Sequence, residues 1–301
     1  MAKNNKYIWI VVCALALLGV LFLIPGQNEA KNTAQNSLLS VASISHGHGL
    51  AVDVEDPSKL YIATHYGLLV LVDDKDLYQV GKSRDDYMGF SPHPTHSKIF
   101  FSSGHPSGGG NIGFQKSEDG GYTWGKVSNG VNGPVDFHAM AISPADPNLI
   151  YGFYRGALQR SLDQGKTWEI VNSNIQVISL TVDSKDSNIV YATTPNGIMI
   201  SRNKGINWTS LSTELEGGHV SVIAVHSADS KILLTFSEKL NGLGKSIDGG
   251  ETWKKIDEDF GGVVIYYVAF GKTDPNTVYA LTQENKIFKS INAGDTWIKI
   301  K

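Results

Sequence analysis

The chain has 301 residues, 41% of them hydrophobic, with 32 glycines and a formal net charge of −3 from 26 basic and 29 acidic side chains. This length fits one large domain or two small ones, and the glycine-rich composition with moderate charge is typical of a turn-rich all-β protein. Basic residues are scattered rather than clustered, which argues against nucleic acid as a partner.

The N-terminal segment, residues 1–25, is an apolar run preceded by positive charge. Lys3 and Lys6 come before "YIWIVVCALALLGVLFLI" at 7–24, and the run ends at Pro25. It is long enough for a transmembrane helix and longer than most signal-peptide apolar regions. Because no small-x-small cleavage pattern follows, an uncleaved membrane anchor is favoured, with a cleaved signal as the alternative. Positive charge before the run predicts that the rest of the chain is exported, either tethered to the cell membrane or secreted.

The stretch after the anchor, residues 26–40, is predicted to be a flexible linker. Residues 26–37 read "GQNEAKNTAQNS", which is polar and free of aromatic residues. "SLLSVAS" at 37–43 is compatible with either an outer strand of the following domain or a continuation of the linker. The single cysteine, Cys13, lies in the apolar run, so the exported part has no disulfides and no thiolate chemistry.

Residues 41–301 repeat a pattern of strands and turns. Each unit has an alternating apolar strand, a turn, a second strand and two short strands. The first turns lie 40 to 50 residues apart, at Asp56, His96, Asp146, Asp186, Asp229 and Asp274. Four strands per unit at this period are typical of propeller blades. No helical periodicity occurs here, so we predict an all-β, six-bladed β-propeller rather than a helical solenoid.

Five units contain a Trp-ended octapeptide between their third and fourth strands. The copies are "SEDGGYTW" at 117–124, "SLDQGKTW" at 161–168, "SRNKGINW" at 201–208, "SIDGGETW" at 246–253 and "SINAGDTW" at 290–297. Ser and Asp side chains hydrogen-bond nearby amides, and Gly supplies a positive φ. We therefore expect structural turns, on the face opposite the functional site.

The octapeptides resemble the Asp-box, or BNR repeat, of sialidases, several glycoside hydrolases and sortilin-like propellers. This resemblance implies the propeller fold, because the motif occurs in enzymes and non-enzymes alike. The arginine triad, Tyr nucleophile and Arg-Ile-Pro signature of sialidases are not recognisable. The first unit also resembles xyloglucanase-type propellers, but His65 stands where those carry a catalytic Asp. The segments "HGL", "SGHP" and "DFHAM" resemble exported glycosyl-hydrolase-like proteins more closely.

The histidines gather on one predicted face, which carries the links between blades and the loops that follow the second strands. Six of the nine map there, five of them in the first three units: His46, His48, His65, His105, His138 and His219. The other three fall near turns on the opposite face. This uneven distribution points to a site at the channel mouth of blades 1 to 3.

One interpretation of this face is a transition-metal site for Zn²⁺, Cu²⁺ or Fe²⁺. "HGH" at 46–48 and "DFH" at 136–138 each place two ligand candidates on the same side of a strand. Imidazole suits all three ions, and a Met ligand suits copper. The candidate ligands are His46, His48, His65, His105, His138 and Met88.

Other interpretations remain open. A carbohydrate-like or small-molecule ligand would use stacking and polar groups from Tyr87, Arg155, Glu238 and Tyr266. Glycoside hydrolysis needs two carboxyl groups, and Asp86 and Asp136 on adjacent blades are the best pair by register. A protein-binding or assembly scaffold, as in sortilin-like and photosystem-assembly propellers, would use the same face or the blade edges. Binding of a metal ion or a carbohydrate-like ligand is preferred, and hydrolysis is the second choice.

Overall fold

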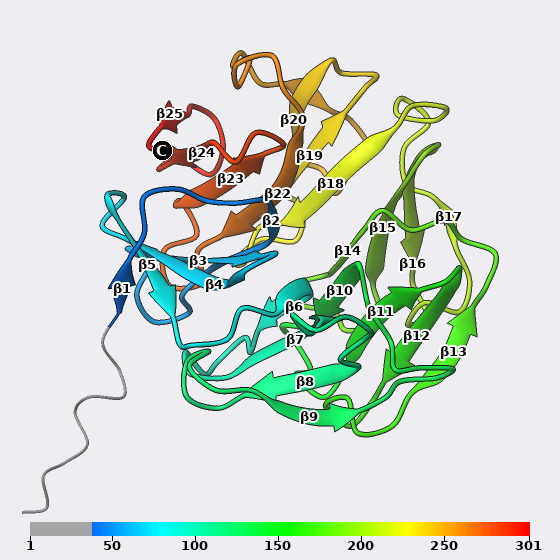
Figure 1. Ribbon diagram of the computed structural model, residues 1–301. Helices are drawn as coiled ribbons and strands as arrows, with labels where there is room; N and C mark the ends of the chain where they lie inside the picture. Colours follow the sequence, from blue (N-terminus) through cyan, green and yellow to red (C-terminus); the bar gives the residue numbers. More distant parts are fainter. Residues whose placement is uncertain (1–37) are drawn as a thin grey trace, which may run out of the picture. The chain divides into compact units, whose positions relative to one another are not determined.

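The computed structural model describes residues 38–301, and this part of the chain is an all-β, six-bladed propeller (Figure 1). Each blade is an antiparallel sheet whose strands pair in chain order, with one added strand in blade 1. The described residues contain no helix, and hence none with the length and apolarity to span a bilayer. The predicted N-terminal anchor or signal helix lies outside them, as does the predicted linker up to residue 37.

Blades 1 to 3 cover the first half of the ring. Blade 1 consists of β1 (Leu39–Ser40), β2 (Gly47–Val52), β3 (Lys59–Thr64), β4 (Gly67–Val72) and β5 (Asp76–Val80). Blade 2 consists of β6 (Asp86–Pro92), β7 (Phe100–His105), β8 (Phe114–Ser117) and β9 (Gly125–Ser128). Blade 3 consists of β10 (Ala139–Ile142), β11 (Ile150–Tyr154), β12 (Ala157–Ser161) and β13 (Glu169–Asn172).

Blades 4 to 6 complete it. Blade 4 consists of β14 (Ser179–Val182), β15 (Val190–Thr194), β16 (Gly197–Ser201) and β17 (Thr209–Ser210). Blade 5 consists of β18 (Val220–Val225), β19 (Leu233–Ser237), β20 (Gly242–Ser246) and β21 (Lys254–Lys255). Blade 6 consists of β22 (Ile265–Phe270), β23 (Val278–Thr282), β24 (Ile287–Ser290) and β25 (Ile298–Lys299). The innermost strand is the first one in blades 2 to 6 and β2 in blade 1, so the central channel is lined by β2, β6, β10, β14, β18 and β22 (Figure 1).

The N-terminal end of the described chain adds an outer strand to blade 1. Leu39 and Ser40 of β1 pair with Gln79 and Tyr78 of β5, which gives this sheet five strands. Residues 39–40, placed in the linker by the sequence, therefore belong to the propeller. Of the two predictions for residues 37–43, an outer strand or linker, the outer strand is confirmed for Leu39 and Ser40.

The ring closes by packing and side-chain contacts between blades 6 and 1, because every blade is built from one continuous segment. The backbone amide of Gly47 donates to Oδ1 of Asn285 at 2.9 Å. Asp74 of blade 1 receives both the Tyr279 hydroxyl, at 3.0 Å, and the Lys289 ammonium, at 2.6 Å. An apolar cluster from β2 to β5, β23 and β24 fills the space behind these contacts.

The apolar core is divided into six clusters, one at each interface between adjacent blades. This follows from the alternation of side chains along a strand, since each sheet has two faces and both are covered by neighbouring blades. Burial of apolar surface at every interface stabilises the ring. The chain therefore has the rigid scaffold that a site built from several blades requires.

The octapeptide turns share one hydrogen-bond pattern. In all five, the Ser hydroxyl accepts the amide of the Gly four residues later at 2.7–2.9 Å. The following Asp or Asn accepts a second amide at 2.8–3.0 Å. Backbone bonds such as Gly120 N to Lys98 O tie these turns to the turns between first and second strands. They are structural staples at the end of the blades opposite the clustered histidines His46, His48, His65, His105 and His138.

Two histidines at that far end cap turns. Nδ1 of His226 accepts the amides of Ala228 and Asp229 at 3.2 and 3.0 Å. The Asp183 carboxylate does the same for two amides in blade 4. His93 Nδ1 accepts the Thr95 amide at 3.2 Å in blade 2. In the turns of blades 2 and 5 an imidazole nitrogen accepts backbone amides, as the Asp183 carboxylate oxygen does in blade 4. His93 and His226 therefore have a structural role.

Candidate functional site

Seven polar side chains from blades 1 to 3 gather at one end of the central channel. They lie where first strands begin or second strands end, and in antiparallel blades both positions are at the same end. They form two groups rather than one. The seven residues are His46, His48, His65, Asp86, His105, Asp136 and His138.

The first histidine cluster consists of His46, His48 and His65 of blade 1. Each offers one nitrogen, and these three nitrogens lie within 4.8 Å of one another. The ring centroids are 4.2 to 4.9 Å apart. His46 has a φ of 46°, in the left-handed region. A non-glycine residue held there costs on the order of 1 kcal/mol, and such strain often occurs at functional sites.

Asp86 at the start of β6 contacts this cluster from blade 2. Its Oδ2 lies 2.5 Å from Nδ1 of His65, and its Oδ1 lies 3.7 Å from Nε2 of His48. An ionised carboxylate only accepts hydrogen bonds, so it holds a proton on Nδ1 of His65. In a neutral His65, Nε2 is then the nitrogen with a free lone pair. A carboxylate in this position orients the histidine ligands of many metal sites.

His48 is buried, with 9% of its surface exposed, and its Nε2 has no hydrogen-bond partner. Burial lowers the pKa of His48 to about 4, against an opposing effect of Asp86. His48 is therefore neutral at pH 7, and the neutral imidazole is the form that coordinates a metal ion. A buried nitrogen without a partner is costly unless something binds it.

The second cluster consists of His105, Asp136 and His138. Nε2 of each histidine lies 2.9 Å from Oδ2 of Asp136. The Asp136 side chain is only 6% exposed, whereas those of His105 and His138 are 40% and 63% exposed. The hydrogen bond to Asp136 raises the pKa of His138, against the opposing effect of burial. Nδ1 of His105 is hydrogen-bonded to the carbonyl of Gly110 at 2.8 Å.

Tyr87 does not lie at the channel mouth, which corrects its assignment as a ligand-stacking residue. It is 1% exposed and packs on Trp124, with ring centroids 4.9 Å apart. Successive side chains of a strand point to opposite sides, so Tyr87 points away from the side on which its neighbour Asp86 lies. Burial raises the pKa of Tyr87 above its usual range.

The remaining predicted site residues occupy different places. Met88 and Tyr266 line the channel cavity, and Tyr266 is 40% exposed. Glu238 lines a second cavity of about 780 Å³, and its Oε2 accepts the backbone amide of His219 at 3.2 Å. Arg155 lies in the exposed turn between β11 and β12, with its guanidinium 5.2 Å from the Tyr154 ring centre.

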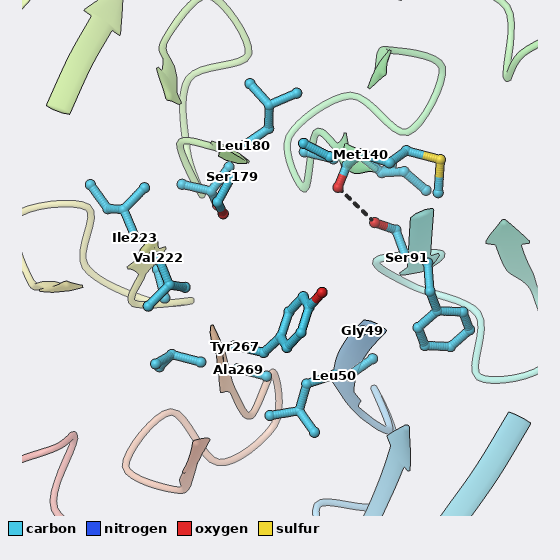
Figure 2. Close-up of a pocket in the computed structure, with 18 of the residues that line it drawn as sticks. Gly49, Leu50, Ser91, Met140, Ser179, Leu180, Val222, Ile223, Tyr267 and Ala269 are labelled. Carbon is cyan, nitrogen blue, oxygen red and sulfur yellow. Dashed lines mark hydrogen bonds between the residues drawn. The ribbon is translucent and has the colours of Figure 1, made fainter. Parts of the chain in front are cut away.

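The channel behind the clusters is a largely apolar cavity of about 530 Å³. Leu50, Met140, Leu180 and Val222 line it from four different blades (Figure 2). In the same view the aromatic side chain of Tyr267 points toward the centre of the channel. His48 and His138 line this cavity too, so the polar site opens into an apolar interior.

Sequence reasoning missed two contributors to this region, Tyr267 and the Gly110 carbonyl. A β-bulge between Ile265 and Tyr267 shifts the register of β22, so simple alternation does not identify the residue facing the channel. The Gly110 contact depends on the path of an insertion, which no residue pattern specifies. The insertion itself, "GHPSGGGNIGF" at 104–114, was the available signal.

Comparison with known proteins identifies the fold. A GH74 enzyme from Niastella koreensis superposes with a TM-score of 0.63 at 17% identity, over 87% of this chain and 46% of that one. A GH74 xyloglucanase from Xanthomonas campestris gives 0.55 at 15%, over 88% and 56%. YCF48 bound to D1 peptide gives 0.55 at 12%, over 88% and 85%.

These similarities concern the fold alone, because the identities are low. The chain spans about half the length of the two GH74 proteins, at 46% and 56% of their chains. No family model matches the sequence, and no curated protein matches it. Propellers with this fold therefore include both GH74 enzymes and a protein bound to a peptide. A function for this chain has to be argued from the residues of its site.

Proposed function

We propose that this protein binds a divalent transition-metal ion at the first histidine cluster, His46, His48 and His65. The observation that carries the proposal is the buried Nε2 of His48, which has no hydrogen-bond partner and belongs to a group of three imidazoles with nitrogens within 4.8 Å of one another. Three neutral imidazoles form a ligand set for Zn²⁺ or Cu²⁺, and such three-histidine sites leave a coordination position for a further ligand.

Asp86 is a positioning residue in this proposal. Its contact with Nδ1 of His65 leaves Nε2 for the ion, and its negative charge favours a cation nearby. Met88, a candidate copper ligand, lines the same cavity. The proposal rests on the nitrogen ligands and does not require Met88.

Glycoside hydrolysis is the alternative supported by the likeness to GH74 folds. Both candidate carboxylates, however, already contact histidines, and Asp136 is almost fully buried. A general acid or nucleophile has to reach the glycosidic bond. Ligand orientation is the role that these contacts favour for Asp86. Activity on xyloglucan that persists in an Asp86→Asn, Asp136→Asn double variant would exclude this pair as the catalytic carboxylates.

We also propose that the site acts outside the cytoplasm. The apolar run at 7–24, with Lys3 and Lys6 before it, supports export and tethering. Metal binding there requires no reducing environment, because no cysteine occurs after residue 13. Fractionation of cells, with protease added to the intact cells, tests whether the propeller is accessible from outside.

The metal proposal is tested by elemental analysis of the full chain, purified without chelator and without a polyhistidine tag. We expect bound Zn or Cu in the unmodified protein and its loss from the first cluster in His48→Gln. His96→Gln is the matched control, because His96 is an exposed histidine at the opposite end of the blades. Absence of bound metal, together with no binding of added Zn²⁺ or Cu²⁺, would contradict the proposal.

A further inference from the structure

We propose a second metal site, formed by His105, Asp136 and His138, that is independent of the first histidine cluster. It takes a divalent ion on two imidazoles and one carboxylate. This is a ligand set known to leave coordination positions open. Both histidines approach the same oxygen, Oδ2 of Asp136, at 2.9 Å. Two ligands about 2.1 Å from one tetrahedral ion lie about 3.4 Å apart, so small side-chain movements suffice.

The donor and acceptor inventory of His105 supports a cation at this place. Its Nδ1 faces the Gly110 carbonyl, which only accepts, so Nδ1 carries the hydrogen. Its Nε2 faces the Asp136 carboxylate, which also only accepts when ionised. A neutral imidazole has a single N–H and cannot donate to both. A second proton, which gives the imidazolium, or a metal ion on Nε2 resolves the conflict, and a metal ion binds the imidazole lone pair and the carboxylate together.

Asp136 provides an independent observation. Its side chain is 6% exposed, and its Oδ1 is buried without a hydrogen-bond partner. A carboxylate in such surroundings needs compensating positive charge or hydrogen bonds. The second oxygen contacts the two histidines, while Oδ1 remains available for bidentate coordination or for a ligand of the ion.

The glycine-rich insertion of blade 2 holds His105 in place. Gly110 accepts from Nδ1 of His105, and the next residue, Asn111, donates to the carbonyl of Pro134 and to the Tyr154 hydroxyl, both at 2.9 Å. The loop is therefore tied to the link that leads into blade 3 and to the end of β11. A carbonyl on the far nitrogen of a ligating histidine is a common orienting contact in metal sites.

The two sites differ in what they offer an ion. The first cluster has three imidazoles, of which His46 is exposed, His65 is 41% exposed and His48 is buried, whereas both histidines of the second site, His105 and His138, are exposed to 40% and 63%. Exposed side chains lose rotamer freedom on binding and compete with water. The second site therefore exchanges its ion more readily and has room for a ligand from solution, such as a carboxylate or a second chelating group.

Zinc titration of the full chain in detergent, after metal removal, tests the second site. We expect two Zn²⁺ per chain, with unequal affinities, from a competition assay with a chromophoric chelator. His138→Gln should remove the weaker ion and keep the tighter one. His48→Gln should do the reverse. Because His138 is exposed, its replacement does not threaten folding, and circular dichroism verifies this.

The outcomes separate the two proposals. A single ion that survives His138→Gln and is lost in His48→Gln overturns the second site and leaves the first. A single ion with the opposite pattern overturns the first site and supports the second. If His105 is simply a protonated partner of Asp136, then Zn²⁺ binds with unchanged stoichiometry in His105→Gln, which also overturns the second site.

Discussion

Replacing Asp86 by Asn tests how the first cluster is organised. Asn has nearly the same shape, but it lacks the charge that holds a proton on Nδ1 of His65. Its amide can donate to Nδ1 instead, which places the proton on Nε2 and blocks the nitrogen needed for the ion. The Asp86 side chain is only 15% exposed, but Asn has nearly the same volume. The variant should therefore still fold.

The expected loss follows from the contact that is removed. Asp86 lies 2.5 Å from His65 and 3.7 Å from His48, so it acts on two of the three imidazoles. Loss of an orienting partner typically weakens metal binding by about 10- to 100-fold. This corresponds to about 1.4 to 2.7 kcal/mol of binding free energy at 25 °C.

The assay is a competition titration with Zn²⁺ at pH 7.5, comparing Asp86→Asn with Asp76→Asn. Asp76 is exposed in blade 1, at the far end of the blade, so its replacement makes the same change in charge away from the cluster. Asp76→Asn should leave the dissociation constant unchanged. Equal affinities in the two variants and the unmodified protein would refute the positioning role of Asp86.

Three further predictions concern the scaffold, each measured by urea unfolding. Ser246→Ala leaves the Gly250 amide buried without its acceptor and should cost about 1 to 3 kcal/mol of unfolding free energy, while a neutral effect would refute the staple role of the turn. Burial lowers the pKa of His226 below its ordinary 6.5. The contribution of neutral His226 to stability is therefore complete above pH 6.5 and declines as the pH falls below 6.5. His226→Asn, which keeps an acceptor, should therefore match the unmodified protein at pH 8 and lose less stability at pH 5; equal pH profiles would contradict this. Lys289→Met removes the contact with Asp74 that helps to close the ring and should cost about 1 kcal/mol, less in high salt; an unchanged free energy would show that this ion pair does not stabilise the closure.

The architecture could be predicted because it depends on local chemistry that repeats. The Ser and Gly of each octapeptide encode a turn with one hydrogen-bond pattern, and these turns fix the blade period. By contrast, β1 has only two residues, Leu39 and Ser40, and no alternation identifies a strand of that length. Its pairing with β5 depends on where the edge of blade 1 lies in three dimensions.

The location of the histidines could be predicted, but their division into two clusters could not. Register places His48 and His138 at one end of the channel, because strand positions determine height along the blade. Which carboxylate each imidazole contacts depends on side-chain rotation, and for His105 this is linked to the Gly110 carbonyl of an irregular loop. Tyr87 was misplaced because its position along the strand was considered without the side to which it points.

Anomalous scattering from crystals of the metal-loaded full chain, recorded on either side of the Zn or Cu absorption edge, tests the central claim most directly. We predict a peak about 2.0 to 2.1 Å from one nitrogen each of His46, His48 and His65. A peak bound elsewhere in the propeller, with none among these three imidazoles, would contradict the first site.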